Sequence, residues 1–187
     1  MPAPSRTLWL LRHAKTETDP PPGGTDFDRV LAARGRRDAT ALGRLFAGGT
    51  ERLDVPRSVH LPAVVLVSPA ARTAATADLV LAKLSSPPEV RPEKVLYNAE
   101  PDEVLEQLHS LEDDVDSAMV VGHNPTAHEL SQSLIAPGDK KGLGLVARRG
   151  FPTCALGIYR FRVERWCDVG FYEAKLVALL VPPFGGR

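Results

Sequence analysis

The stretch "LWLLRHAKTE", residues 8–17, joins a short apolar run directly to an arginine and a histidine. The run does not alternate between apolar and polar residues, so it predicts a strand over residues 7–11 that is covered on both faces. Arg12 and His13 stand where this strand ends. Ligands bind outside the carboxyl ends of parallel strands, so both side chains are candidates for a functional site.

A second buried strand is predicted at residues 62–67, "PAVVLV", and a helical pattern follows it at once. In "SPAAR" we expect Ser68 to cap this helix and Pro69 to occupy its first position, because these residue types favour those places. Arg72 then lies in the first turn. The free N–H groups of a helix N-terminus favour anions, and the planar guanidinium of arginine fits phosphate oxygens.

A third buried strand, residues 117–122, ends in a similar way. His123 leaves the strand, Asn124 is expected to cap the next helix, and Pro125 opens it. In a parallel sheet these three strand ends bring two histidines, two arginines and two helix N-termini to one edge. Such an edge is positively charged, or able to become so, and it predicts a site for a phosphoryl group.

Amphipathic helical patterns separate the strands, and this alternation predicts the fold. The patterns cover residues 32–46, 68–84, 101–111 and 124–135. We expect an α/β protein, a three-layer α/β/α sandwich with a mainly parallel central sheet and helices on both faces. One domain is expected over residues 1–187, with a loose N-terminal tail at residues 1–5. Residues 136–144 are expected to be a loop, and residues 154–166 a fourth strand that enters a hairpin with the segment after it.

The composition indicates which classes of binding partner and which cellular compartment to expect. The chain has 187 residues, with 23 Lys and Arg against 23 Asp and Glu, so its net charge is zero. This balance argues against binding to nucleic acid or to an anionic membrane, both of which favour a basic excess. The two cysteines form no CxxC pair, and no run approaches the ~18 apolar residues of a membrane span. We expect a cytoplasmic protein; the oligomeric state is left open.

Taken together, the three strand-end motifs make the chain similar to the histidine phosphatase superfamily, whose Arg-His-Gly motif appears here as "RHAK". Within that superfamily the chain resembles the short, SixA-type phosphohistidine phosphatases nearly end to end. The matching segments are "LLRHAKT", "DFDRVLAARGRRDA", "VVLVSPAARTAATA", "VLYNAE", "VVGHNPT" and "FPTCALGIYRF". The resemblance implies a phosphoglycerate-mutase-like fold and a phosphatase that needs no metal and no other cofactor.

The resemblance also implies a role for each residue at the predicted sheet edge. His13 is the nucleophile, while Arg12, Arg72 and His123 bind the phosphoryl oxygens. A protonated His123 would add to the stabilising charge, and the protonation state of its resting ring is left open. A neutral imidazole attacks phosphorus in line and forms a phosphohistidine, which splits one difficult displacement into two easier ones. Cationic side chains stabilise the charge on the equatorial oxygens. The competing interpretation of the two histidines, a metal site, lacks a compact ligand spacing such as HExxH.

Four residues near these motifs could also contribute to the site or to its backbone geometry. Ala14 stands where the family motif has glycine, which narrows the backbone freedom of the turn. Lys15 and Thr16 are candidates for additional phosphate contacts, or else a solvated lysine and a capping threonine. Glu100 lies in the interval from which larger members of the superfamily supply a general acid, although an acidic helix N-terminus explains it equally well.

Three functions follow from these residues. Only 51 residues separate Arg72 from His123, which leaves little chain for a lid, and an open site suits a protein phosphohistidine or another phosphoprotein. One alternative is a small-molecule phosphomonoesterase with the same core, in which Glu100 would matter strongly. The other is a phospho-recognition module that binds without turnover. A phosphoglycerate mutase would need a closed pocket that retains the phosphoryl group.

Overall fold

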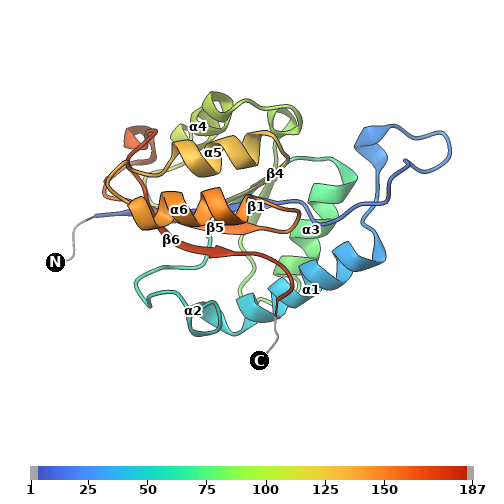
Figure 1. The fold of residues 1–187 in the computed structure, drawn as a ribbon, viewed down its shortest axis with the longest axis horizontal. Helices are drawn as coiled ribbons and strands as arrows, with labels where there is room; N and C mark the ends of the chain where they lie inside the picture. Colours follow the sequence, from blue (N-terminus) through green and yellow to red (C-terminus); the bar gives the residue numbers. More distant parts are fainter. Residues whose placement is uncertain (1–3, 185–187) are drawn as a thin grey trace.

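In the computed structural model, which describes residues 4–184, six strands form one sheet in the order β3-β2-β4-β1-β5-β6 (Figure 1). The strands are β1 (Arg6–Arg12), β2 (Val64–Val67), β3 (Glu89–Pro92), β4 (Ser117–Gly122), β5 (Leu156–Phe161) and β6 (Lys175–Leu180). Strands β3, β2, β4 and β1 are parallel neighbours, whereas β5 and β6 are antiparallel to theirs. The predicted α/β class and mainly parallel sheet are confirmed, and β5 and β6 form the expected antiparallel pair. Residues 1–3 of the expected tail lie outside the described residues.

Helices cover both faces of this sheet. They are α1 (Ala33–Ala47), α2 (Gly49–Arg52), α3 (Ala71–Leu81), α4 (Pro101–His109), α5 (Thr126–Ser133) and α6 (Lys140–Arg149). Three short 3-10 turns are η1 (Asp26–Asp28), η2 (Lys94–Tyr97) and η3 (Trp166–Asp168). Helices α1 and α3 pack on one face of the sheet, and α4, α5 and α6 pack on the other. The result is the three-layer arrangement expected from the sequence.

Strand β1 lies between β4 and β5, and helices cover both of its faces. Leu8 and Leu10 face the layer of α4, α5 and α6, whereas Trp9 and Leu11 face the layer of α1 and α3. None of these four side chains is more than 1% exposed. Burying a side chain of this size stabilises the fold by about 1.5–3 kcal/mol. This packing fixes the position of the end of β1, and therefore the positions of Arg12 and His13.

The starts of α3 and α5 differ from the prediction. Neither Ser68 nor Asn124 caps a helix, and Pro69 lies ahead of α3 instead of opening it; Pro125 is itself the N-cap residue of α5. A residue before a proline favours extended backbone, which suits a helix cap and a loop equally, so this local signal does not decide where either helix begins. Arg72 still lies in the first turn of α3. The side chains of the two predicted caps are left free for tertiary contacts.

The stretch expected to be a loop at residues 136–144 contains the start of α6, so that prediction was wrong. Asp139 caps this helix, and its carboxylate accepts a hydrogen bond from the backbone N–H of Gly142 at 2.9 Å. A Cβ at Gly142 would lie 2.5 Å from Oδ2 of Asp139, so the glycine makes room for the cap. Glycine has a low helix propensity, and Gly142 and Gly144 therefore hid the helical pattern.

Strand β3 was not predicted. It has four residues at the edge of the sheet, and three of them are exposed. An edge strand of this kind shows neither an apolar run nor a clear alternation. Its Arg91 pairs with Glu89 and Glu112, and such charges keep a sheet edge from pairing with another chain.

The parallel register brings three strand ends to one edge of the sheet. Arg12 pairs with Gly122 across β1 and β4, and Val67 pairs with Val121 across β2 and β4. Beyond this edge, the chain between β1 and α1 forms the long blue segment that projects in Figure 1 and carries η1. Among residues 4–184, no helix is both long and apolar enough to cross a membrane.

Candidate active site

Two histidine rings and an arginine meet beyond the ends of β1, β2 and β4. The ring centroids of His13 and His123 lie 5.3 Å apart. Arg72 reaches this point from the first turn of α3, and its Nε–H donates to Nδ1 of His123 at 3.2 Å. The backbone N–H of His13 donates to the carbonyl of Gly122 at 3.0 Å, which ties the end of β1 to the end of β4. The structure thus brings three of the predicted site residues together.

The tautomer of His13 follows from its hydrogen bond. Its Nδ1 lies 2.8 Å from the carbonyl oxygen of Ala14, and because a carbonyl only accepts, Nδ1 carries the proton. Nε2 of the neutral ring then holds a free lone pair. Burial lowers the pKa of His13 to about 4, and the positive charges of Arg12 and Arg72 act in the same direction. At neutral pH the side chain is an uncharged imidazole.

His123 is neutral as well, a point that the sequence left open. Its Nδ1 accepts from Arg72, so the ring proton lies on Nε2, which donates to Oγ of Ser68 at 2.8 Å. Burial lowers the pKa of His123 to about 3, and the charge of Arg72 acts in the same direction. Positive charge at this point of the site therefore comes from the arginine.

The lowered pKa of His13 predicts how activity depends on pH. Protonation removes the lone pair of Nε2, so a reaction that uses this lone pair is lost as the pH falls through about 4 and is retained near neutral pH. We expect the acid limb of kcat/KM near pH 4, after correction for ionisation of the substrate. A limb near the ordinary histidine pKa of about 6.5 would contradict this assignment.

Ser68 orients the ring of His123, and its removal has an expected effect on stability. In Ser68→Ala the buried Nε2–H loses its acceptor, which lowers the free energy of unfolding by about 1–3 kcal/mol. Urea denaturation followed by tryptophan fluorescence measures this change. Ser110→Ala is the matched control, because Ser110 donates to the carbonyl of Gln107 on the exposed end of α4. Equal stability of the two variants would contradict the buried hydrogen bond.

Asp26, in the η1 turn, clamps the guanidinium of Arg72. Nη1 of Arg72 donates to the backbone carbonyl of Asp26 at 2.6 Å, and Nη2 donates to its Oδ2 at 3.0 Å. Oδ2 also accepts from the hydroxyl of Tyr97 at 2.9 Å, and Oδ1 accepts from Nη1 of Arg29 at 2.9 Å. The hydrogen bond from Arg29, assisted by Tyr97 and Arg72, lowers the pKa of Asp26 to about 2. This carboxylate is ionised at neutral pH.

Arg12 has a buried donor without a partner. Its Nη1 donates to the carbonyl of Phe151 at 2.9 Å, in the loop that follows α6. Its Nε is buried and has no hydrogen-bond partner in the part of the chain that the structure describes. Buried donors of this kind are rare in folded proteins and are commonly met by an ion or by water. The charge of Arg12 also contributes to the lowered pKa of His13, so its guanidinium lies close to the site.

Ala14, the residue in place of the family glycine, fits the turn without strain. It is fully buried, and its φ is not in the positive region. Its N–H donates to Oγ1 of Thr76 at 3.0 Å, which ties the turn to α3. The turn after β1 therefore needs no glycine.

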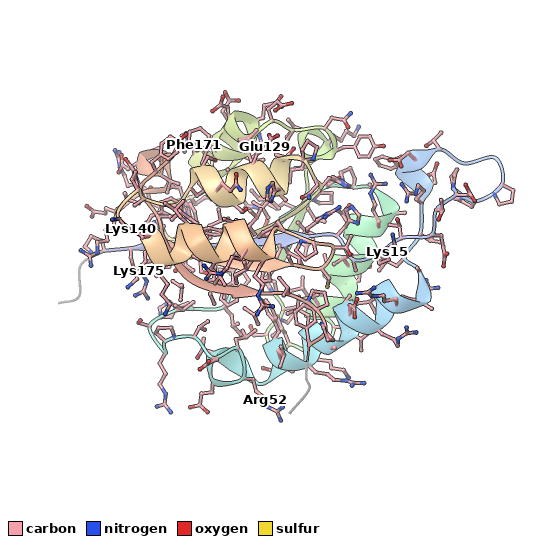
Figure 2. All side chains as sticks on the ribbon, viewed as in Figure 1. Lys15, Arg52, Glu129, Lys140, Phe171 and Lys175 are labelled. Carbon is pink, nitrogen blue, oxygen red and sulfur yellow. The ribbon has the colours of Figure 1, made fainter. Side chains whose placement is uncertain are left out.

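The other predicted site residues, Lys15, Thr16 and Glu100, have separate environments. Lys15 is exposed just beyond the end of β1, near α3 (Figure 2). Thr16 is buried, and its hydroxyl accepts from Nη2 of Arg29 at 2.7 Å, so it supports the segment that carries η1. Glu100 is the N-cap residue of α4, where its N–H donates to the carboxylate of Glu103 at 2.8 Å. Within residues 4–184, Glu100 forms no hydrogen bond or ion pair with the two histidines or two arginines of the site.

Three residues of this site were missed or misassigned from the sequence. Asp26 and Tyr97 lie in segments covered by the family resemblance, but neither was given a role, and Ser68 was assigned only as a cap. The ring of Tyr97 lies edge-on to His123, with centroids 5.5 Å apart, and 5.6 Å from the guanidinium carbon of Arg72. Asp26, Tyr97 and Ser68 could have been found only from their place in the segments that match the family. Nothing else in the sequence indicates them, because only the folded chain brings them to the strand ends.

This arrangement can bind a tetrahedral oxyanion beside a neutral imidazole that has a free lone pair. The two arginines supply planar donors that suit phosphoryl oxygens. Among residues 4–184, no group of three or more His, Cys, Asp and Glu side chains is arranged to hold a metal ion.

Comparisons with known proteins agree on one family. A family model described as "Histidine phosphatase superfamily (branch 1)" matches residues 8–94. An uncharacterised protein of Mycobacterium leprae (strain TN) is 32% identical over 174 residues, which cover 92% of this chain and 99% of that protein. A solved structure from Nakamurella multipartitia, assigned as the phosphohistidine phosphatase SixA, has a TM-score of 0.76 and 30% identity and covers 98% of this chain and 99% of its own. A second structure with that assignment, from Agrobacterium tumefaciens, has a TM-score of 0.74 and 28% identity, with 95% and 98% covered.

Proposed function

The chain belongs to the histidine phosphatase superfamily, in its short SixA-type branch, and we propose that this phosphatase removes the phosphoryl group from a protein phosphohistidine. We propose further that the reaction passes through a covalent phosphohistidine on His13. The observation that carries this proposal is the hydrogen bond from Nδ1 of His13 to the carbonyl of Ala14, which leaves the lone pair of Nε2 free. The roles of Arg12, Arg72 and His123 below are part of the same proposal.

In the first step, Nε2 of His13 attacks the phosphorus atom in line. The new P–N bond forms while the bond between phosphorus and the substrate nitrogen breaks, and the electron pair of the broken bond returns to that nitrogen. Attack needs no prior loss of a proton, because the pKa of His13 is about 4 and its ring is neutral. His13 keeps its Nδ1 proton on the carbonyl of Ala14, so the phosphorylated ring is an imidazolium.

In the second step, water attacks phosphorus from the side that the leaving group has vacated. The P–N bond to His13 breaks, its electron pair returns to Nε2, and inorganic phosphate leaves with the oxygen of the water molecule. The released proton passes to phosphate or to solvent. Because the ring departs as neutral imidazole with its proton still on Nδ1, the starting tautomer is restored without a further proton transfer.

Arg12 and Arg72 stabilise the negative charge of the phosphoryl oxygens in both steps. The charge of Arg12 contributes to the lowered pKa of His13, and this closeness to the nucleophile supports the role. Removing one such electrostatic contact in an enzyme site costs roughly 2.7–4 kcal/mol of transition-state stabilisation. Neutral His123 holds the Nε–H of Arg72 and so orients its guanidinium. These side chains supply the positive charge that a metal ion supplies in other phosphatases, and we propose a reaction that is independent of metal.

The second candidate is a small-molecule phosphomonoesterase with the same core. An ester leaves as an alkoxide or phenoxide, and it benefits from an acid that protonates the bridging oxygen. Glu100, the candidate acid, is engaged at the N-terminus of α4, and the ionised Asp26 has no proton to donate at neutral pH. A phosphohistidine leaves as imidazole and depends less on such an acid, which favours the phosphohistidine as substrate.

Hydrolysis of a phosphohistidine peptide and of p-nitrophenyl phosphate, both with excess EDTA, tests the proposal. We expect metal-independent turnover with the larger kcat/KM for the peptide. A larger kcat/KM for the ester, with a large loss in Glu100→Gln and none in Glu106→Gln on the same helix, would favour the phosphomonoesterase. Activity that EDTA removes and added metal restores would contradict metal independence. Binding of inorganic phosphate without turnover of either substrate would favour the recognition module.

A further inference from the structure

Asp26 is a carboxylate, ionised at neutral pH, on the exposed side of a site for anions. The side chain of Arg72 is only 8% exposed, whereas the side chain of Asp26, against which it lies, is 54% exposed. Asp26 therefore lies between the buried floor of the site and solvent. A negative charge at this point weakens the attraction of the site for a phosphoryl dianion. Asp26 holds Arg72, and a direct role in the reaction needs in addition a group of the substrate that a carboxylate attracts.

The hydrogen bonds of Asp26 leave one acceptor position open. A carboxylate has about four lone-pair positions. Oδ2 accepts from Arg72 and from Tyr97, and Oδ1 accepts from Arg29. These three are the titratable or charged groups that face the carboxylate, and the fourth position, on Oδ1, has no partner within residues 4–184. The free position belongs to a side chain that is half exposed, so a substrate can reach it.

Aromatic side chains flank this carboxylate. The rings of Phe27 and Tyr97 lie edge to face, with centroids 5.1 Å apart, and both residues are partly exposed. Phe27 follows Asp26 in η1, and the hydroxyl of Tyr97 donates to Asp26. An acceptor beside aromatic edges and faces suits a flat ring that carries an N–H group.

The leaving group of a phosphohistidine is such a ring. The phosphoryl group occupies one ring nitrogen, and the other nitrogen can carry a proton. When it does, the ring leaves phosphorus as neutral imidazole and the scissile nitrogen needs no proton. A phosphoester has no second position of this kind, because its proton must reach the bridging oxygen itself.

We propose that Asp26 accepts a hydrogen bond from the distal ring N–H of a phosphohistidine and thereby selects this substrate over phosphoesters. This inference rests on the function proposed above. In-line attack by His13 requires the leaving ring to lie on the far side of phosphorus, and the proposal directs that ring toward Asp26, which contacts Arg72 from the exposed side. The P–N bond breaks, its electron pair stays on the proximal nitrogen, and the proton stays on the distal nitrogen facing Asp26.

The same arrangement already exists at the nucleophile. The Nδ1–H of His13 is held by the carbonyl of Ala14, so the ring that attacks phosphorus keeps its proton on the distal nitrogen. Asp26 supplies the matching acceptor for the ring that leaves. Because Asp26 carries a full charge, it also raises the pKa of a bound imidazolium, and an opposite charge within contact distance typically does so by about 1–3 units.

Asp26→Asn tests the inference, since asparagine has the same shape and keeps an acceptor oxygen but no charge. Asp28→Asn is the matched control, because Asp28 lies in the same turn and, among the residues that the structure describes, its carboxylate accepts only from Thr25. Each variant and the wild type are assayed with a phosphohistidine peptide and with p-nitrophenyl phosphate. For Asp26→Asn we expect kcat/KM to fall roughly tenfold or more with the peptide and to rise a few-fold with the ester. Asp28→Asn should leave the ratio of the two unchanged.

The pH profile of kcat with the peptide gives a second readout. Activity falls at high pH when the distal nitrogen of the bound ring loses its proton. Asp26 delays this loss, so we expect the alkaline limb of Asp26→Asn to move to lower pH by roughly one unit. A role confined to holding Arg72 would lower kcat without moving this limb.

The outcomes separate this inference from the proposed function. Equal losses with both substrates, or a peptide-to-ester ratio that does not change, would overturn the role of Asp26 while the wild type still prefers the peptide. A wild type that hydrolyses the ester and not the peptide would overturn the proposed substrate itself. A shift of the ratio in Asp28→Asn as large as in Asp26→Asn would assign the effect to the charge of the whole turn and overturn the specific contact.

Discussion

His13→Ala is expected to lower kcat by roughly 10⁴- to 10⁶-fold, as the loss of a catalytic nucleophile does in other enzymes. The variant has no ring nitrogen to attack phosphorus, so the two-step route is closed. What turnover is left comes from phosphate binding and water alone. Steady-state assays with the phosphohistidine peptide measure the loss, at enzyme concentrations high enough to detect the remaining activity.

The matched control is His60→Ala, because His60 is exposed and lies ahead of β2, outside the site. This variant should keep wild-type kcat. His13→Ala should still bind inorganic phosphate in calorimetry, because Arg12 and Arg72 remain. A loss of less than tenfold in His13→Ala, with phosphate binding intact, would contradict nucleophilic catalysis and favour a recognition module.

Arg72→Lys is expected to lower kcat/KM by roughly 10²- to 10³-fold, the scale found when one stabilising contact of an enzyme site is removed. Lysine keeps the charge, but its donors share one nitrogen, so it cannot reproduce the three contacts that the guanidinium makes with His123 and Asp26 through Nε, Nη1 and Nη2. It also lacks the planar fork that matches phosphoryl oxygens. Assays with the peptide and with p-nitrophenyl phosphate should show losses of similar size, because both substrates carry the same phosphoryl group.

Arg91→Lys is the control for this substitution. Arg91 makes comparable paired contacts with Glu89 and Glu112, but it does so on the exposed edge strand β3. Surface ion pairs of this kind contribute about 0–1 kcal/mol to stability. The ion pairs of Arg91 lie on the edge strand, outside the site. A loss within threefold in Arg72→Lys, equal to that of the control, would contradict the proposed role of Arg72.

The sheet could be predicted because its three central strands are unusually clear in the sequence. Strands β1, β2 and β4 are continuous apolar runs, which is typical of strands buried on both faces. Helical patterns between them predict parallel neighbours. The rule that parallel strands deliver their carboxyl ends to one edge then placed Arg12 and His123 in one neighbourhood, and β1 and β4 do pair with Arg12 opposite Gly122.

Local signals failed where tertiary packing decides the structure. Exposed side chains hid β3, and the glycines of α6 hid a helix that Asp139 caps. The Ser-Pro pair predicted a helix cap at Ser68, but α3 begins further along, with Ala70 as its N-cap residue. In the fold, the hydroxyl of Ser68 accepts from the ring of His123.

The electrostatics of the site depends on contacts between distant parts of the chain. Asp26 lies 46 residues before Arg72 and 71 before Tyr97, and no spacing rule joins them. The neutral state of His123 follows from burial and from the charge of Arg72, neither of which a sequence shows. Sequence reasoning therefore reached the residue types at the sheet edge, but not the protonation states that decide their chemistry.

The most direct test of the central claim is to trap the phosphoenzyme. A peptide carrying a radiolabelled phosphohistidine is mixed with excess enzyme, quenched with alkali within the first turnover, and the protein is mapped by mass spectrometry. We predict a labelled phosphoryl group on Nε2 of His13 that forms and decays at rates consistent with kcat and that is absent from His13→Ala. Full release of labelled phosphate with no protein-bound label at any quench time would contradict the covalent route.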